Sequence, residues 1–258
     1  MAHLFTIIFY QPILNLLVFL YNTISFQDLG IAIILLTAVI KLVFWPLGRT
    51  AIKSQKSLQD LQPKIDELKK KFVNDKAGLS RATMDLYKEN QVNPFSSCLP
   101  LLIQLPFLWA VYRVFSDGIN NNLDLVYSFV YRPEALNVLS LGFLDLAKTN
   151  IYLAVLAGLA QFWQAKMLMV KKPVVKPAEG AVKEDNMMAM MNKQMLYFMP
   201  AITIFIGASL PGGLTLYWLV ITLLTALQQL VTINKKKNTN SPSNLTSTSK
   251  TIEGEIVK

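Results

Sequence analysis

The sequence predicts an all-α polytopic membrane protein with a five-span helical core, a cytoplasmic helical hairpin and an N-terminal interfacial helix. Its 258 residues are 53% hydrophobic, with a mean hydropathy of +0.38. This is too apolar for an ordinary soluble domain. The apolar residues gather in runs close to the roughly 20 residues that cross a bilayer. Lysines and arginines concentrate in alternate connections between these runs.

Residues 1–29 are expected to form the interfacial helix. The apolar run from His3 to Tyr21 is interrupted at Gln11, Pro12 and Asn15. After Pro12, apolar residues recur at the spacing of an amphipathic helix. The segment has no basic start and no small-residue cleavage site, which argues against a cleaved signal peptide. An uncleaved signal-like segment and a sixth span are the alternatives.

Residues 30–50 are expected to be the first span, and they hold Lys41 inside an apolar stretch. A lysine near the middle of a span costs about 2.5 to 3.5 kcal/mol on insertion scales, so it should face water, a partner or the bundle interior. Snorkelling toward the interface competes with this interpretation, because the lysine side chain is long. The residues alone favour neither a functional position inside the membrane nor snorkelling. Thr37 lies four positions earlier and shares a helix face with Lys41.

Residues 51–93 are expected to form the cytoplasmic helical hairpin. Apolar residues recur there every three or four positions on one helix face: Leu58, Leu61, Ile65, Leu68 and Phe72. A second helical stretch follows the polar segment from Asn74 to Gly78. Pro63 predicts a kink or break within the first helix. A solvated pair of helices that only cover each other's apolar faces would show the same pattern.

The remaining segments are predicted from the lengths of the apolar runs and from the turn residues that separate them. The Pro211-Gly212-Gly213 sequence predicts a tight turn that divides the last apolar run into two spans. The expected order is a second span at 94–115, an outer loop at 116–150, a third span at 151–170, a cytoplasmic loop at 171–194, the fourth and fifth spans at 195–233, and a disordered basic-polar tail at 234–258.

The charges of the connections predict the orientation. Basic residues dominate 51–93, 171–194 and the start of the tail, whereas 116–150 holds more acidic than basic residues. The positive-inside rule therefore places the first three in the cytoplasm and 116–150 outside. We expect a multi-pass protein of the cell inner (plasma) membrane, with the N-terminus outside and the C-terminus cytoplasmic.

Several classes of function are disfavoured. One cysteine, Cys98, and one histidine, His3, exclude a disulfide framework and a classical zinc site, and Cys98 is read as a packing residue. We find no nucleophile elbow, HExxH or phosphate-binding glycine loop. The predicted spans contain no aspartate or glutamate, which many proton-coupled transporters would need. We therefore expect no enzyme, no cofactor, no metal and no specific nucleic-acid partner.

Spaced motifs resemble the YidC family of membrane protein insertases. They are, in order, FWPL at 44–47, LQPK at 61–64, LYKE at 86–89, NP at 93–94, CLPLLIQLP at 98–106, LPGGLTLYW at 210–218 and QQ at 228–229. The resemblance covers about residues 11–237. It implies a five-span core with a hydrophilic groove that is open to the cytoplasm and to lipid, and an insertase and chaperone function without nucleotide. Clients would be newly made membrane proteins, and the Sec translocon and the ribosome are further candidate partners.

The resemblance also implies groove residues. Lys41 stands where the family has an arginine, so the charge is kept but the bidentate guanidinium is not. Thr37 and Gln104 match polar groove positions, and Tyr217 with Trp218 forms an aromatic pair. The chain resembles the compact form of the family, without a large outer domain or an N-terminal lipobox cysteine. A small transporter or channel subunit with Lys41 in its pathway is the alternative, and a structural assembly subunit is a third.

Overall fold

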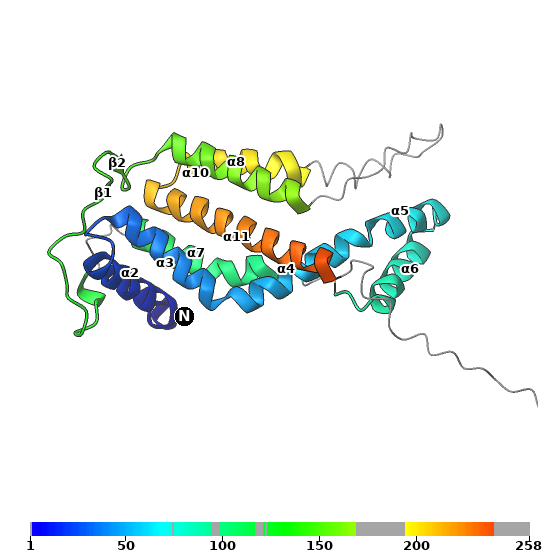
Figure 1. The fold of residues 1–258 in the computed structure, drawn as a ribbon, viewed down its shortest axis with the longest axis horizontal. Helices are drawn as coiled ribbons and strands as arrows, with labels where there is room; N and C mark the ends of the chain where they lie inside the picture. Colours follow the sequence, from blue (N-terminus) through cyan, green and yellow to red (C-terminus); the bar gives the residue numbers. More distant parts are fainter. Residues whose placement is uncertain are drawn as a thin grey trace, which may run out of the picture.

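The computed structural model describes residues 2–73, 75–93, 99–116, 121, 123–168 and 194–239. The helices form an elongated bundle with a helical hairpin at one end and a long loop at the other (Figure 1). We call these the hairpin end and the loop end, and residues 121 and 123–150 the long loop. The positions of Cys98, of nearly all of the expected 171–194 loop and of the tail from 240 lie outside the described residues.

The N-terminal segment is one helical run made of α1 (Ala2–Phe5), the π-helix η1 (Thr6–Tyr10) and α2 (Gln11–Thr23). The long loop follows α2 along its length. Gln11 Nε2 donates to the Leu125 carbonyl at 3.1 Å, and Asn22 Nδ2 donates to the Tyr131 carbonyl at 2.6 Å. The stretch His3–Thr23 is long and apolar enough to cross a membrane. The interfacial position of this segment remains a prediction.

The expected span at 30–50 contains a bend between two helices, and its crossing of the membrane as one span stays a prediction. α3 (Leu29–Val43) ends at Val43, and α4 (Trp45–Asp60) begins after Phe44. The helix axis turns by 70° between Leu29–Val43 and the run Trp45–Lys71. Pro46, in the first turn of α4, has no backbone N–H and its ring interferes with the preceding turn. This is the physical reason for the bend, which we had not predicted.

The hairpin end is built from α4, α5 (Gln62–Lys71) and α6 (Lys76–Glu89). The break predicted at Pro63 is confirmed, because α4 ends at Asp60 and Pro63 lies in the first turn of α5. Ile65 is buried where α5 packs against α6. The carboxylate of Asp75 accepts a hydrogen bond of 2.8 Å from Gly78 N and so begins α6.

The next helix, α7 (Leu99–Ser116), leads into the long loop. The loop contains a 3₁₀ turn, η3 (Leu123–Leu125), and an antiparallel pair of short strands, β1 (Leu139–Ser140) and β2 (Leu144–Asp145). The turn between the strands places Leu141 and Gly142 at positive φ. The sequence had not predicted this β-hairpin.

The last helices are α8 (Ile151–Leu168), the π-helix η4 (Gln194–Phe198), α10 (Met199–Gly207) and α11 (Gly212–Thr239). The predicted break between the two helices is confirmed, but the turn is formed by residues 208–211, and Gly212 and Gly213 already begin α11. A 2.8 Å hydrogen bond from Gly212 N to the Lys148 carbonyl holds this point to the long loop. α11 continues through residues 234–239, which we had assigned to the disordered tail. Those residues contain no glycine or proline that would end a helix.

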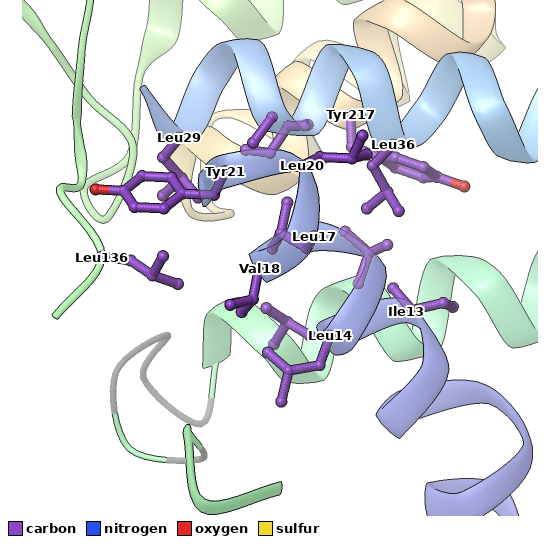
Figure 2. Packing of buried hydrophobic residues seen from close by; sticks show 14 of the residues in the cluster. Ile13, Leu14, Leu17, Val18, Leu20, Tyr21, Leu29, Leu36, Leu136 and Tyr217 are labelled. Atoms are coloured by element: carbon purple, nitrogen blue, oxygen red, sulfur yellow. The ribbon is translucent and has the colours of Figure 1, made fainter. Parts of the chain in front are cut away.

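The bundle has one main apolar core. Figure 2 shows Leu14, Leu17 and Val18 of α2 in one cluster with Leu29 and Leu36 of α3, with Leu136 of the long loop at one side. Tyr217 of α11 belongs to the same buried cluster. The core therefore joins α2, α3, the long loop and α11.

Two helices among the described residues, His3–Thr23 and Gly212–Ile233, are long and apolar enough to cross a membrane, and the bent pair at Phe44 is a third if it is counted as one span. The predicted all-α polytopic membrane protein is confirmed. The division into five spans at the stated boundaries remains a prediction.

Candidate functional site

A pocket of about 60 Å³ lies where α3 ends, between α3, α4, α7 and α11. It is lined by Ile40, Lys41, Phe44, Leu47, Gly48, Ala51, Gln104, Phe107 and Ile221. This volume holds a few water molecules. Most of the lining side chains are apolar. The exceptions are the amide of Gln104 and the ammonium of Lys41.

Lys41 provides the positive charge of the pocket. It lies in the last turn of α3, because the helix ends at Val43. Its Nζ donates a hydrogen bond of 2.9 Å to Thr225 Oγ1 of α11, and this hydroxyl donates to the Ile221 carbonyl at 2.6 Å. The carbonyl end of a helix favours a cation. Lys41 is therefore not in the middle of a straight span, as we had expected, but beside the bend.

Gln104 and Tyr217, both predicted site residues, are brought together. Gln104 Nε2 donates a hydrogen bond to Tyr217 Oη, and the tyrosine is completely buried. Gln104 also lines the pocket with Lys41. The bond joins α7 to α11 on the wall of the pocket.

Thr37 and Trp218 are not brought into the pocket. Thr37 is fully buried, and its hydroxyl donates to the carbonyl of Ile33 in its own helix at 2.6 Å. Trp218 follows Tyr217 directly, and consecutive residues of a helix point about 100° apart. Neither side chain is among those that line the pocket.

Other residues of the site escaped the sequence interpretation. Thr225 bonds to Lys41, and Phe44 and Phe107 line the pocket with ring centroids 5.0 Å apart. Phe107 also meets Phe9 of η1 at 5.8 Å, which links the pocket to the N-terminal segment. One signal for Thr225 was available: Tyr217, Ile221 and Thr225 are separated by four residues each, so they share a face of α11.

Among the described residues, no group of three or more histidine, cysteine, aspartate or glutamate side chains is placed to hold a metal ion. The chemistry of the pocket is instead electrostatics and hydrogen bonding, from the ammonium of Lys41, the amide of Gln104 and the hydroxyls of Thr225 and Tyr217 to which they donate. The fold and the pocket define a class: a polytopic helical membrane protein with a positive charge in a pocket between its helices.

The chain belongs to the family described as 60Kd inner membrane protein, whose model matches residues 19–240. A protein of Syntrophus aciditrophicus named membrane protein insertase YidC is 38% identical over 229 residues, which are 88% of this chain and 36% of the relative. One of Citrifermentans bemidjiense with the same name is 37% identical over 228 residues, 87% of this chain and 36% of the relative.

A third relative with that name, from Fusobacterium nucleatum, is 34% identical over 229 residues, which are 88% of this chain and 97% of the relative. The chain thus spans little more than a third of the first two relatives and nearly all of the third. The resemblance seen in the sequence motifs is confirmed at the level of the family.

Proposed function

We propose that this chain is a membrane protein insertase and chaperone that admits polar client segments into the pocket around Lys41, alone or beside the Sec translocon. The observation that carries the proposal is the ammonium of Lys41, held by Thr225 in a pocket at the junction of four helices. The relatives' names, membrane protein insertase YidC, support the same function.

The physical task of an insertase is to lower a barrier. A polar segment that crosses an apolar bilayer core loses its hydrogen bonds to water, at a cost of several kcal/mol for each unsatisfied group. A pocket with room for water, reached from one side of the membrane, shortens the dry distance. The hydrophobic segment of the client can then move sideways into lipid while its polar flank stays solvated.

Lys41 has two roles in this proposal. Its charge attracts acidic client residues, and it keeps water in the pocket because an ammonium is expensive to dehydrate. Thr225 holds the ammonium on the α11 side, so the charge stays beside Gln104 rather than reaching toward the membrane surface. No nucleotide is needed, because client binding and lipid partitioning supply the free energy.

The topology belongs to the same proposal. The loop charges favour a topology with the hairpin of α5 and α6 and the C-terminus in the cytoplasm, and with the N-terminus and the long loop on the outer side of the inner membrane. Figure 1 has the hairpin and the long loop at opposite ends of the bundle, which this topology requires. Newly made membrane proteins and the bilayer are the proposed partners, with the Sec translocon and the ribosome as further candidates.

Reconstitution tests the proposal. The purified chain would be placed in liposomes, and protease protection would follow the insertion of a short single-span client with an acidic flank. We expect insertion above that of empty liposomes, and less for a client whose acidic residues are replaced by lysine. Failure of the folded protein to insert either client contradicts the proposal. Solute flux without insertion would favour the transporter or channel alternative.

A further inference from the structure

Six aromatic side chains are at least 76% exposed, and no other large apolar side chain in the described ranges is as exposed. All six lie at the loop end of the bundle. We call them the aromatic rim: Phe26, Phe129, Tyr131, Phe143, Tyr152 and Phe205. They come from the α2–α3 turn, the long loop, the start of α8 and the last turns of α10, which Figure 1 has at the same end.

Hydrogen bonds hold the segments of the rim together. Asp28 accepts from Leu141 N and from Ser140 Oγ, each at 2.6 Å, and so ties the α2–α3 turn to the β-hairpin that carries Phe143. Asn22 donates to the carbonyl of Tyr131. The rim therefore rests on a scaffold with defined contacts, and its exposure is not that of a free chain end.

Phe26 combines exposure with a strained backbone. Its φ is 54°, a left-handed conformation that bulky residues rarely adopt. Backbone hydrogen bonds from Gln27 N to the Tyr21 carbonyl and from Asp28 N to the Ser25 carbonyl hold this turn. Phe26 is 94% exposed, so the turn presents its ring outward. A partner outside the chain that takes up the ring would remove it from water.

The charges of the long loop are partly cancelled within it. Arg132 pairs with Asp124 at 2.5 Å, and Lys148 pairs with Asp145 at 3.0 Å. Pairing lowers the charge that these segments carry toward a neighbouring surface. A surface that carries paired charges and exposed aromatic rings is suited to the membrane–water interface, which is partly polar and partly apolar.

The rim continues an apolar face of α8. Tyr152, Val155, Leu156 and Leu159 are exposed and recur at helical spacing, so they form one face of the helix. On a membrane helix such a face meets acyl chains. Tyr152 marks the loop-end limit of this face, and tyrosine is enriched where acyl chains give way to headgroups.

We propose that the aromatic rim rests in the headgroup region of the bilayer leaflet at the loop end, so that the long loop lies on the lipid surface instead of in water. The partner is lipid. Tyr131 and Tyr152 combine an apolar ring with a polar hydroxyl, which is favoured at this boundary. The four phenylalanines would bury apolar rings there, and the apolar face of α8 leads directly to it.

Fluorescent depth measurement tests the rim. In a Cys98→Ser background, single cysteines Phe26→Cys, Phe129→Cys and Phe143→Cys would carry an environment-sensitive label in phosphatidylcholine–phosphatidylglycerol vesicles. Nitroxides would be attached to the lipid headgroup or to shallow or deep acyl positions. Met84→Cys on α6 is the matched control, because it is exposed and apolar but lies at the hairpin end.

We expect headgroup and shallow nitroxides to quench the three rim labels at least threefold more than the Met84→Cys label, and aqueous iodide to show the reverse order. Equal iodide quenching at the rim and at α6 overturns the proposal. Shielding from both iodide and nitroxide also overturns it, since a protein partner or a second copy would then cover the rim. Client insertion plays no part in this test.

A second set of variants controls for effects of the label. With the label at position 26, Phe129→Ser with Phe143→Ser should raise iodide quenching, whereas Phe129→Trp with Phe143→Trp should leave it unchanged. Circular dichroism would verify that both double variants stay helical. Equal quenching in the serine and tryptophan variants contradicts a role of these rings in anchoring the loop to lipid.

Discussion

Gln228 of α11 donates a hydrogen bond of 2.8 Å to the carbonyl of Trp45, the first residue of α4 after the bend at Phe44. The Gln228 side chain is fully buried. It fits because residue 48 is glycine: a Cβ at Gly48 would lie 2.8 Å from Gln228 Oε1. The contact ties α11, which holds Lys41 through Thr225, to the helix that leaves the pocket toward the hairpin end.

Gly48→Ala is expected to lower the free energy of unfolding by about 1 to 3 kcal/mol, because the added methyl group pushes Gln228 away from Trp45. Thermal unfolding in detergent measures this. Gln228→Ala removes the clash, so the double variant should lose less than the sum of the single losses. Thr50→Ala, an exposed position on α4, is the control. Additive losses would show that Gly48 and Gln228 do not interact.

Lys41→Ala is expected to impair client insertion at least tenfold, because the pocket loses its charge and the water that the charge retains. Lys41→Arg should insert clients at close to the original rate, since the charge is kept. The liposome assay measures both. Lys53→Ala, an exposed lysine of α4, is the matched control. Equal activity of all these chains would show that the charge is dispensable.

Deletion of residues 54–92 is expected to reduce client insertion while the membrane bundle stays folded. The hairpin of α5 and α6 lies at the end of α4 that leads away from the pocket, where we expect clients to arrive. Circular dichroism and thermal unfolding would check the bundle before insertion is measured. Undiminished insertion by this shortened chain would remove the hairpin from the proposed client pathway.

Asp28 predicts an acid-sensitive attachment of the long loop. Partial burial opposes ionisation of its carboxyl, but hydrogen bonds from Leu141 N, Ser140 Oγ and Ile31 N outweigh it and hold the pKa below its ordinary value of 3.8. Because the folded pKa is lower than the unfolded one, the ionised group stabilises the fold above the unfolded pKa. This contribution is lost as the pH falls through the folded pKa.

Thermal unfolding at a series of pH values measures the effect, with a loss of stability expected below about pH 4. Asp28→Asn should keep the helix start of α3 but remove this part of the pH dependence. Asp60→Asn, in an exposed pair with Lys56, should change the profile little. An unchanged profile for Asp28→Asn would mean that Asp28 does not carry the acid sensitivity.

Gly213→Ala is expected to destabilise the loop end by about 1 to 3 kcal/mol, because the new Cβ would meet the Phe115 ring of α7. Thermal unfolding again provides the measure. Phe115→Leu in the same chain should recover part of the loss by making room for the methyl group. Phe115→Leu alone is the control, and no recovery in the double variant contradicts the proposed clash.

Local breaks were predictable where a proline stands between helical patterns with a clear face. Pro63 was read in this way, because Leu61 and Ile65 mark the face on both sides of it. Pro46 has the same effect on the backbone, but it lies in a continuous apolar run that shows no change of pattern. Hydropathy alone therefore gave no sign of the bend, and it placed Lys41 farther from a helix end than the structure does.

Contacts between distant residues were beyond the sequence. Gln104 and Tyr217 were chosen separately, through the family resemblance, and only the fold shows that they bond to each other. Thr225 was one of several threonines in apolar runs, each able to bond to its own backbone, as Thr37 does. Which hydroxyl meets the ammonium depends on how α3 and α11 are rotated about their axes.

Because α3 ends at the bend at Phe44, its length is shorter than the thickness of the bilayer core. Its 15 residues extend about 22 Å, whereas a bilayer core is about 30 Å thick. Such a hydrophobic mismatch is accommodated by thinner lipid beside the helix or by flanking polar residues drawn inward. Either response shortens the apolar path next to Lys41. Pro46, two residues after Phe44, would in this way influence the local thickness of the membrane as well as the position of a charge.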